Sequence, residues 1–148
     1  MTQNEALEKI KKYCAYQERC QTEVRTKLLE FKLTVENIEN IICCLIEEDF
    51  INEERFSRSF VRGKFRQKKW GKIKIRQSLQ YKNISEYCIR KGFEEIDEEE
   101  YLKTLESILK KKEGLLNEEN EFIRQQKLAK YAISRGFENN LVWNHLTT

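Results

Sequence analysis

Residues 24–45 read VRTKLLEFKLTVENIENIICCL, and residues 75–96 read IRQSLQYKNISEYCIRKGFEEI. A shift of 51 residues superimposes their apolar positions: Val24 on Ile75, Leu28 on Leu79, Leu33 on Ile84, Ile38 on Ile89, Ile42 on Phe93 and Leu45 on Ile96. A further shift of 53 residues places Leu128, Ala132, Phe137 and Val142 on the same pattern. The apolar residues recur at helical spacing on both sides of a polar junction, which predicts a repeated helical unit.

Each copy also has one more amphipathic stretch on its N-terminal side, which makes it a three-helix unit. The expected helices cover residues 4–17, 21–31 and 35–45, then 53–67, 72–81 and 85–93, and finally 98–112, 118–135 and 138–145. Thr34, Asn52 and Asn117 precede three of these helices and are suited to cap them. Lys32, Asn83 and Gly136 occupy the matched place after each second helix, where a left-handed residue commonly ends a helix.

Composition supports a helical protein. The 148 residues include no proline and only five glycines, although sheets with many turns need both residue types. We therefore predict an all-α fold of three tandem three-helix repeats, at residues 1–50, 51–96 and 97–148. Units of about 50 residues have little core of their own, so we expect neighbours to stack into an elongated, curved body.

The residue counts also argue against several functions. His145 is the only histidine, so a catalytic triad or a zinc site would lack imidazole groups. The five cysteines are odd in number and form no C-x-x-C pair, which favours a reducing cytoplasm over a disulfide framework. No apolar run approaches the length that crosses a bilayer. We expect a cytoplasmic protein that is not an enzyme, with no catalytic residues, no metal, no cofactor and no membrane contact.

The charges are sorted along the chain, although the net charge is only +3. Residues 55–85 contain eleven basic residues and no acidic one, while residues 36–54 and 94–106 carry seven acidic residues each. Such a basic block is expected to attract a polyanion or an acidic partner. The predicted contact residues are Arg55, Arg58, Arg62, Lys64, Arg66, Lys68, Lys69, Trp70, Lys72, Lys74 and Arg76. The alternative is a solvated helix face.

Aromatic residues lie between these basic residues, and their spacing separates packing from binding. Phe56, Phe60 and Val61 fall on one helical face, so we predict that they pack in the core. Trp70 stands beside Gly71 at a helix junction and is the better candidate for contact with a partner.

Two further features have structural interpretations. Lys110, Lys111 and Lys112 end a predicted helix, where cations are favourable without any partner. The adjacent Cys43 and Cys44 lie between Ile42 and Leu45 on an apolar helix, so inert core positions are expected rather than a redox site.

Three segments resemble the RecX family, bacterial regulatory proteins that act on the recombinase RecA. They are FINEERFSRSFV at residues 50–61, GKIKIRQSLQYKNIS at 71–85 and KLAKYAISRGF at 127–137. Arg55, Phe56, Phe60 and Val61 match the family pattern in the first segment, while Asn52 and Glu53 replace its usual aspartates. Asn83 replaces a glycine in the second, and Cys20 stands where a serine is usual. The order and spacing of the segments carry the resemblance over nearly the whole chain.

The resemblance implies a regulator that lies in the groove of the RecA filament on single-stranded DNA. Such a protein would inhibit or remodel recombinase and ATPase activity in DNA repair, recombination and the SOS response. The implied partners are the RecA filament and single-stranded DNA, met directly or through the filament, and a monomer is expected. Two alternatives remain open at this point: an independent helical DNA-binding module and a helical scaffold that binds only protein.

Overall fold

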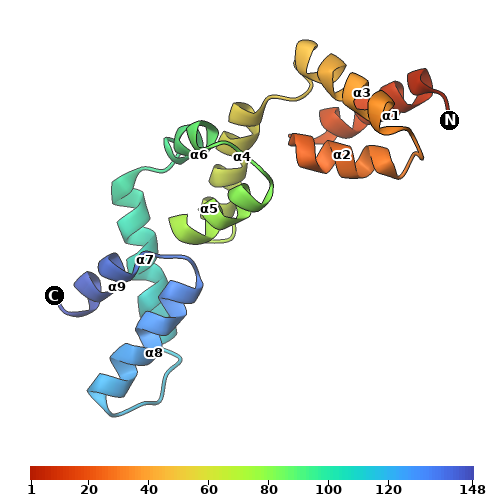
Figure 1. The fold of residues 1–148 in the computed structure, drawn as a ribbon. Coiled ribbons are helices and arrows are strands. Elements are labelled where there is room, and N and C mark those ends of the chain that lie inside the picture. The colour runs from red at the N-terminus through yellow and green to blue at the C-terminus, as the bar shows by residue number, and fades with distance from the viewer. The chain divides into compact units, whose positions relative to one another are not determined.

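The computed structural model covers residues 1–148 and contains nine α-helices and no strand (Figure 1). The helices are α1 (Gln3–Tyr16), α2 (Gln21–Leu29), α3 (Val35–Glu47), α4 (Glu53–Arg66), α5 (Lys72–Tyr81), α6 (Glu86–Phe93), α7 (Glu98–Glu113), α8 (Glu121–Ser134) and α9 (Asn139–Leu146). This confirms the predicted all-α class. No helix combines the length and the apolar character that crossing a membrane requires.

The chain forms two compact units. The first contains Met1–Phe60 and Leu79–Gly92, and the second contains Val61–Ser78 and Phe93–Thr148. The nine helices follow one another in the predicted order, while the division into repeats at residues 1–50, 51–96 and 97–148 stays a prediction.

The core of the first unit comes from the apolar faces of its first three helices. Its fully buried side chains include Ile10 of α1, Leu28 of α2 and Leu45 of α3, each without exposed surface. Phe50 and Leu33 pack against this cluster from its edge. Three faces of different helices bury one common set of aliphatic groups, and this apolar burial is the main favourable term in folding.

Most predicted helix ends are confirmed by the structure. The side chain of Thr34 accepts a hydrogen bond from Asn37 N at 3.2 Å, and that of Asn52 accepts one from Arg55 N at 2.9 Å. The predicted cap at Asn117 is wrong: α8 begins at Glu121, and Asn120 caps it by accepting from Ile123 N at 3.0 Å. Both asparagines are suitable caps, so residue type alone could not choose between them.

Left-handed residues end the second helix of each predicted repeat. Lys32, Asn83 and Gly136 have φ angles of 59°, 62° and 101°. In two of these turns the backbone returns to its own helix, through hydrogen bonds from Ile84 N to the Leu79 carbonyl and from Phe137 N to the Ala132 carbonyl. The matched positions therefore share one conformation, although their residue types differ.

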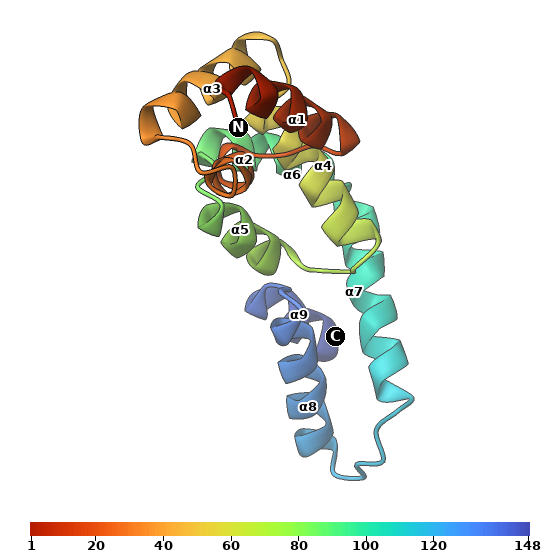
Figure 2. The ribbon, with the colours of Figure 1, turned by 90° about the vertical axis from the view of Figure 1, so that its right-hand side faces the viewer.

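The interior of the second unit is built around aromatic rings. Tyr101 of α7 is fully buried, with its ring centroid 5.7 Å from that of Phe65 and 5.1 Å from that of Phe137. Leu105 and Leu109 continue the buried face of α7. Figure 2 shows α7 and α8 side by side and joined by the loop that precedes α8.

The cysteine prediction is wrong in part. Cys43 is exposed and Cys44 is half-buried, because the buried face of α3 passes through Ile38, Ile41, Ile42 and Leu45. The Cys44 thiol donates to Glu48 Oε2 at 3.3 Å, and this hydrogen bond raises the pKa of the thiol. Apolar neighbours in sequence therefore do not place a helical residue in the core, because adjacent positions point in different directions.

Candidate nucleic-acid or filament interface

The predicted contact residues divide between the two units and between two kinds of environment. Arg55 and Arg58 belong to the first unit, and the other nine belong to the second. The aromatic prediction holds for Phe56, which is buried, while Phe60 is half-buried and stacks on it with ring centroids 5.7 Å apart.

Arg55 is engaged inside the first unit. Its Nε lies 2.5 Å from Glu18 Oε2, its Nη1 lies 3.1 Å from Asp49 Oδ2, and its Nη2 donates to the Asp49 carbonyl at 2.9 Å. Arg58 Nε lies 3.3 Å from Glu54 Oε2 one turn earlier on α4. The Arg55 guanidinium therefore ties the start of α4 to the loops before α2 and before α4.

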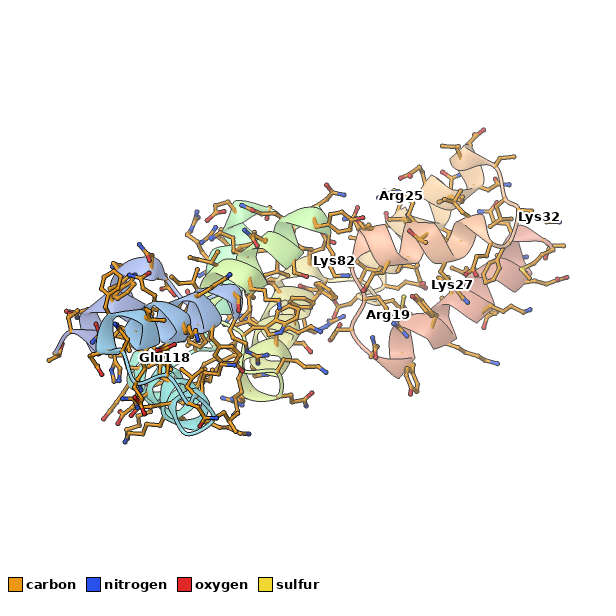
Figure 3. All side chains as sticks on the ribbon, turned by 90° about the horizontal axis from the view of Figure 1, so that it is seen from below. Arg19, Arg25, Lys27, Lys32, Lys82 and Glu118 are labelled. Carbon is orange, nitrogen blue, oxygen red and sulfur yellow. The ribbon has the colours of Figure 1, made fainter.

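Other cations of the first unit, including Arg19, Arg25 and Lys82 (labelled in Figure 3), are also matched by internal partners. Arg25 binds Glu39 through two hydrogen bonds of 2.7 and 3.0 Å. Lys82 Nζ lies 3.2 Å from Glu23 Oε2, and Arg19 lies over the Tyr13 ring at 3.8 Å. Much of the positive charge of this unit is thus held by its own carboxylates and rings.

In the second unit, four predicted contact residues lie against aromatic rings or carboxylates. Lys64 and Lys74 place their ammonium groups 4.9 and 4.6 Å from the centroid of the Trp70 ring. Arg62 Nη1 lies 2.6 Å from Glu95 Oε1, and Arg76 lies over the Phe93 ring at 5.3 Å. Trp70 is half-buried, and its cation–π contacts with Lys64 and Lys74 hold the indole in a defined position at the surface.

Lys72 makes its contacts inside the protein. Its ammonium group binds the Glu98 carboxylate and lies 4.7 Å from the centroid of the Tyr101 ring. Its backbone N–H donates to the Tyr101 hydroxyl at 2.9 Å, and that hydroxyl in turn donates to Glu138. Burial raises the pKa of Tyr101, so the phenol stays protonated and keeps this donor.

Arg66, Lys68 and Lys69 differ from the rest of the block. All three are exposed, and none takes part in an ion pair within the protein. Lys69 adopts a left-handed conformation with φ 58°, which turns the chain between α4 and α5. These three residues and the neighbouring Trp70 form the part of the predicted site that is open to a partner, and we call residues 66–70 the basic loop.

Backbone contacts hold the basic loop and the start of α5 in place. Gly71 N donates to the Arg135 carbonyl at 2.8 Å, and Ile73 N donates to the Gly136 carbonyl at 2.9 Å. The Arg135 guanidinium donates to the Lys68 carbonyl. The first N–H groups of α5, which have no partner within their own helix, are thereby satisfied by residues that follow α8 and by Tyr101.

The sequence missed a second group of basic residues in the same unit. Lys103, Lys111 and Lys112 of α7 and Arg135 after α8 line a cavity together with Lys69. These residues come from three separate segments, so no charge run identifies them. The lysine run at residues 110–112 was the one feature of the sequence that pointed to this group. Lysines at the end of a helix are also expected without any partner, because they interact favourably with the helix dipole.

The chain contains no cluster of three or more His, Cys, Asp or Glu side chains that could hold a metal ion. The arrangement of exposed cations beside a held indole can bind phosphates and stack on bases, or can bind carboxylates of a protein partner.

Comparison with known proteins finds similarity to one family. Residues 52–92 match the family model described as RecX, second three-helix domain. A regulatory protein RecX of Halalkalibacterium halodurans is 25% identical over 130 residues, which cover 88% of this chain and 49% of that protein. A regulatory protein RecX of Streptococcus uberis is 31% identical over 130 residues, covering 88% of this chain and 50% of that protein. The chain thus spans about half the length of these curated relatives.

The fold is shared with a solved structure as well. A crystal structure of a regulatory protein RecX matches with a TM-score of 0.88 and 24% identity, covering 98% of this chain and 72% of that chain. The matched segment of the family model contains α4, α5 and the basic loop between them. Residues 52–92 of the chain are therefore similar to the second three-helix domain of RecX, and most of the chain is similar to regulatory proteins of that family.

Proposed function

We propose that this chain regulates RecA by binding the filament that RecA forms on single-stranded DNA. Binding inhibits or remodels the ATPase and recombinase activity of the filament, which places the protein in the control of DNA repair, recombination and the SOS response. Similarity to regulatory proteins of the RecX family supports this function, and the resemblance of three segments to that family names RecA as the target.

The observation that carries the proposal is the unmatched positive charge of the basic loop. Arg66, Lys68 and Lys69 are exposed and have no carboxylate partner, whereas Arg55, Arg62 and Lys72 are engaged inside the protein. A phosphate backbone or an acidic protein surface supplies the missing counter-charge. The backbone contacts of the loop reduce the conformational entropy lost when a partner binds.

The regulator works through binding alone. A protein that binds one state of the filament more tightly than another shifts the filament toward that state, by no more than the difference in binding free energy. Preference for a state that cannot exchange strands or turn over ATP inhibits both activities without any catalytic group in the regulator.

The test is the DNA-dependent ATPase of RecA from the same organism, measured with and without this protein. We expect the wild-type chain to change the rate and the double variant Arg66→Glu/Lys68→Glu to lose most of that effect. The control is Lys9→Glu/Lys12→Glu, which makes the same charge change at two exposed lysines of α1. No effect of the wild-type protein, or equal losses in both variants, would reject the proposal.

The two other functional classes give different results in the same assays. Tight, salt-dependent binding to bare DNA that RecA does not alter would indicate an independent DNA-binding module. Binding to a protein partner that is insensitive to nucleic acid would indicate a scaffold.

A further inference from the structure

A cavity of about 430 Å³ lies among α7, α8 and the loop after α4, entirely within the second unit. Its volume falls in the range of small-molecule sites. Five of its lining residues are basic, namely Lys69, Lys103, Lys111, Lys112 and Arg135, and Glu100 is its one carboxylate. Figure 2 shows the two helices that form its sides.

The positive charge of this cavity is largely unmatched. Lys69, Lys111, Lys112 and Arg135 form no ion pair, and Lys103 approaches the exposed Glu99 only to 3.9 Å. Lys112 lies 4.8 Å from the centroid of the Tyr131 ring, a contact that leaves its charge in place. Cations gathered at this density repel one another, so an anion that enters the cavity is stabilised.

Arg135 is fixed at the wall of the cavity. Its Nη2 group donates to the Lys68 carbonyl, while its Nε–H group is buried and has no acceptor in the protein. The guanidinium is thus held beside the cavity, and its positive charge has no carboxylate partner.

The cavity also has apolar and hydroxyl-bearing walls. Tyr131 is half-buried, Ile108 and Leu115 add aliphatic surface, and Leu115 is 72% exposed. Thr104 and Ser107 add hydroxyl groups. Cations on one part of the wall and an aromatic ring with aliphatic surface on another fit a ligand that joins a phosphate to a flat, apolar ring.

We propose that this cavity binds one nucleotide unit of a single-stranded nucleic acid. The phosphate lies among Lys103, Lys111 and Arg135, and the base packs on Tyr131 and Leu115. Lys69 belongs both to the cavity and to the basic loop, so a strand that follows the basic loop reaches the cavity. The identity of this strand rests on the proposed function: if the protein binds the RecA filament, the strand is the single-stranded DNA of that filament.

The first experiment measures binding of the full-length protein to a fluorescent oligothymidylate by anisotropy over a range of salt concentrations. We expect Lys111→Glu to weaken binding by about fivefold or more at low salt and to lower the salt slope by about 0.7 for each lost phosphate contact. Lys110→Glu is the matched control, because Lys110 is the neighbouring residue on α7, pairs with Glu106 and does not line the cavity. Equal weakening in both variants, or none in Lys111→Glu, overturns the site.

A second experiment locates the base and separates the possible sources of the ligand. An oligonucleotide that carries 5-iododeoxyuridine should crosslink to Tyr131 under ultraviolet light, and a crosslink confined to other residues overturns the proposal. Free thymidine monophosphate should compete far more weakly than the oligonucleotide. Equal competition by the mononucleotide, or by a polyglutamate peptide, overturns the assignment to a strand.

The experiments can reject the nucleotide site and the proposed function independently of each other. Weakened oligonucleotide binding in Lys111→Glu, combined with no effect of the wild-type protein on RecA, keeps the site and rejects the regulator. An effect on RecA that depends on Arg66 and Lys68, combined with unchanged oligonucleotide binding in Lys111→Glu, keeps the regulator and rejects the site.

Discussion

The backbones of Gly71 and Gly136 lie against each other. A Cβ atom built on Gly71 would come within 2.3 Å of the carbonyl carbon of Gly136, and the carbonyl of Gly136 accepts from Ile73 N. Both glycines occur in segments that resemble the RecX family, one before α5 and one after α8. Their contact joins the start of α5 to the end of α8 and brings Arg135 beside Lys68.

Gly71→Ala should destabilise the protein, because the new methyl group meets backbone that cannot move aside as a flexible side chain can. We expect a loss of about 1–3 kcal/mol or more, as for other overpacked sites. Gly63→Ala is the control, since a Cβ atom added there in α4 meets nothing within 4 Å beyond the backbone of its own helix. That change should stabilise the helix by roughly 0.5–1 kcal/mol. Urea unfolding gives the free energy of unfolding of both variants. An unchanged value for Gly71→Ala would mean that the contact between Gly71 and Gly136 is loose.

The repeat pattern predicted much of the fold because apolar spacing controls which helix face is buried. Leu28 and Leu79 were matched in sequence, and both are fully buried. Asn120 could not be preferred to Asn117 as a cap, since the loop before α8 contains both and residue type does not fix where a helix starts. Cys43 shows the same limit at the level of one residue, because local apolarity does not give the direction of a side chain.

The candidate site was less predictable than the fold. A run of basic residues gives the sign of the charge but not its partners, and the partners depend on tertiary contacts. Arg55 and Lys72 look the same as Arg66 in the sequence, yet their counter-charges lie 37, 6 and 26 residues away. The cavity residues Lys103 and Arg135 come together only through the packing of α7 and α8.

Arg55→Gln should act on folding, because the Arg55 side chain binds Glu18 and Asp49. The pair with Glu18 holds the pKa of Arg55 above its usual value. The Arg55 side chain is 38% exposed, so solvent screens these contacts and we expect a loss of about 1 kcal/mol that shrinks at high salt. Arg90→Gln, at an exposed position of α6, should leave the melting temperature nearly unchanged. Equal melting temperatures for the two variants would show that the Arg55 contacts contribute nothing.

Tyr101→Phe tests the hydrogen bonds that hold the start of α5. The ring contacts with Phe65 and Phe137 remain, but Lys72 N–H and the Glu138 carboxylate lose their partner. Leaving buried polar groups unpaired should cost about 1–3 kcal/mol. Tyr81→Phe removes the same hydroxyl at a position that is 87% exposed and should be neutral. Urea unfolding of both variants tests this, and equal midpoints for Tyr101→Phe and Tyr81→Phe would contradict the prediction.

Cys20 makes stability depend on pH in the alkaline range. The residue is fully buried before α2, and burial raises the pKa of its thiol from 9.0 to about 11. Above pH 9 the thiol of the unfolded chain ionises while the folded chain keeps its proton, so the unfolded state binds fewer protons and stability falls as pH rises. The contribution of the protonated thiol is complete below pH 9 and is lost between pH 9 and about 11. At pH 10 the loss should be about 1.4 kcal/mol, since one pKa unit corresponds to that free energy.

Cys20→Ser removes this loss, because the hydroxyl does not ionise in this range. Serine is also a better N-cap than cysteine, and its oxygen can accept from Glu23 N while Glu23 continues to accept from the backbone N–H of residue 20 at 3.2 Å. Urea unfolding at pH 7.5, 9 and 10 under reducing conditions should show the variant gaining on the wild type as pH rises. Cys43→Ser is the control, because that thiol meets solvent in the folded and the unfolded chain, and its curve should follow the wild type. If the free energies of unfolding of Cys20→Ser and the wild type change in parallel with pH, the alkaline sensitivity does not come from Cys20. If the stability of Cys43→Ser departs from that of the wild type as pH rises, the prediction that Cys43 is equally exposed in both states is wrong.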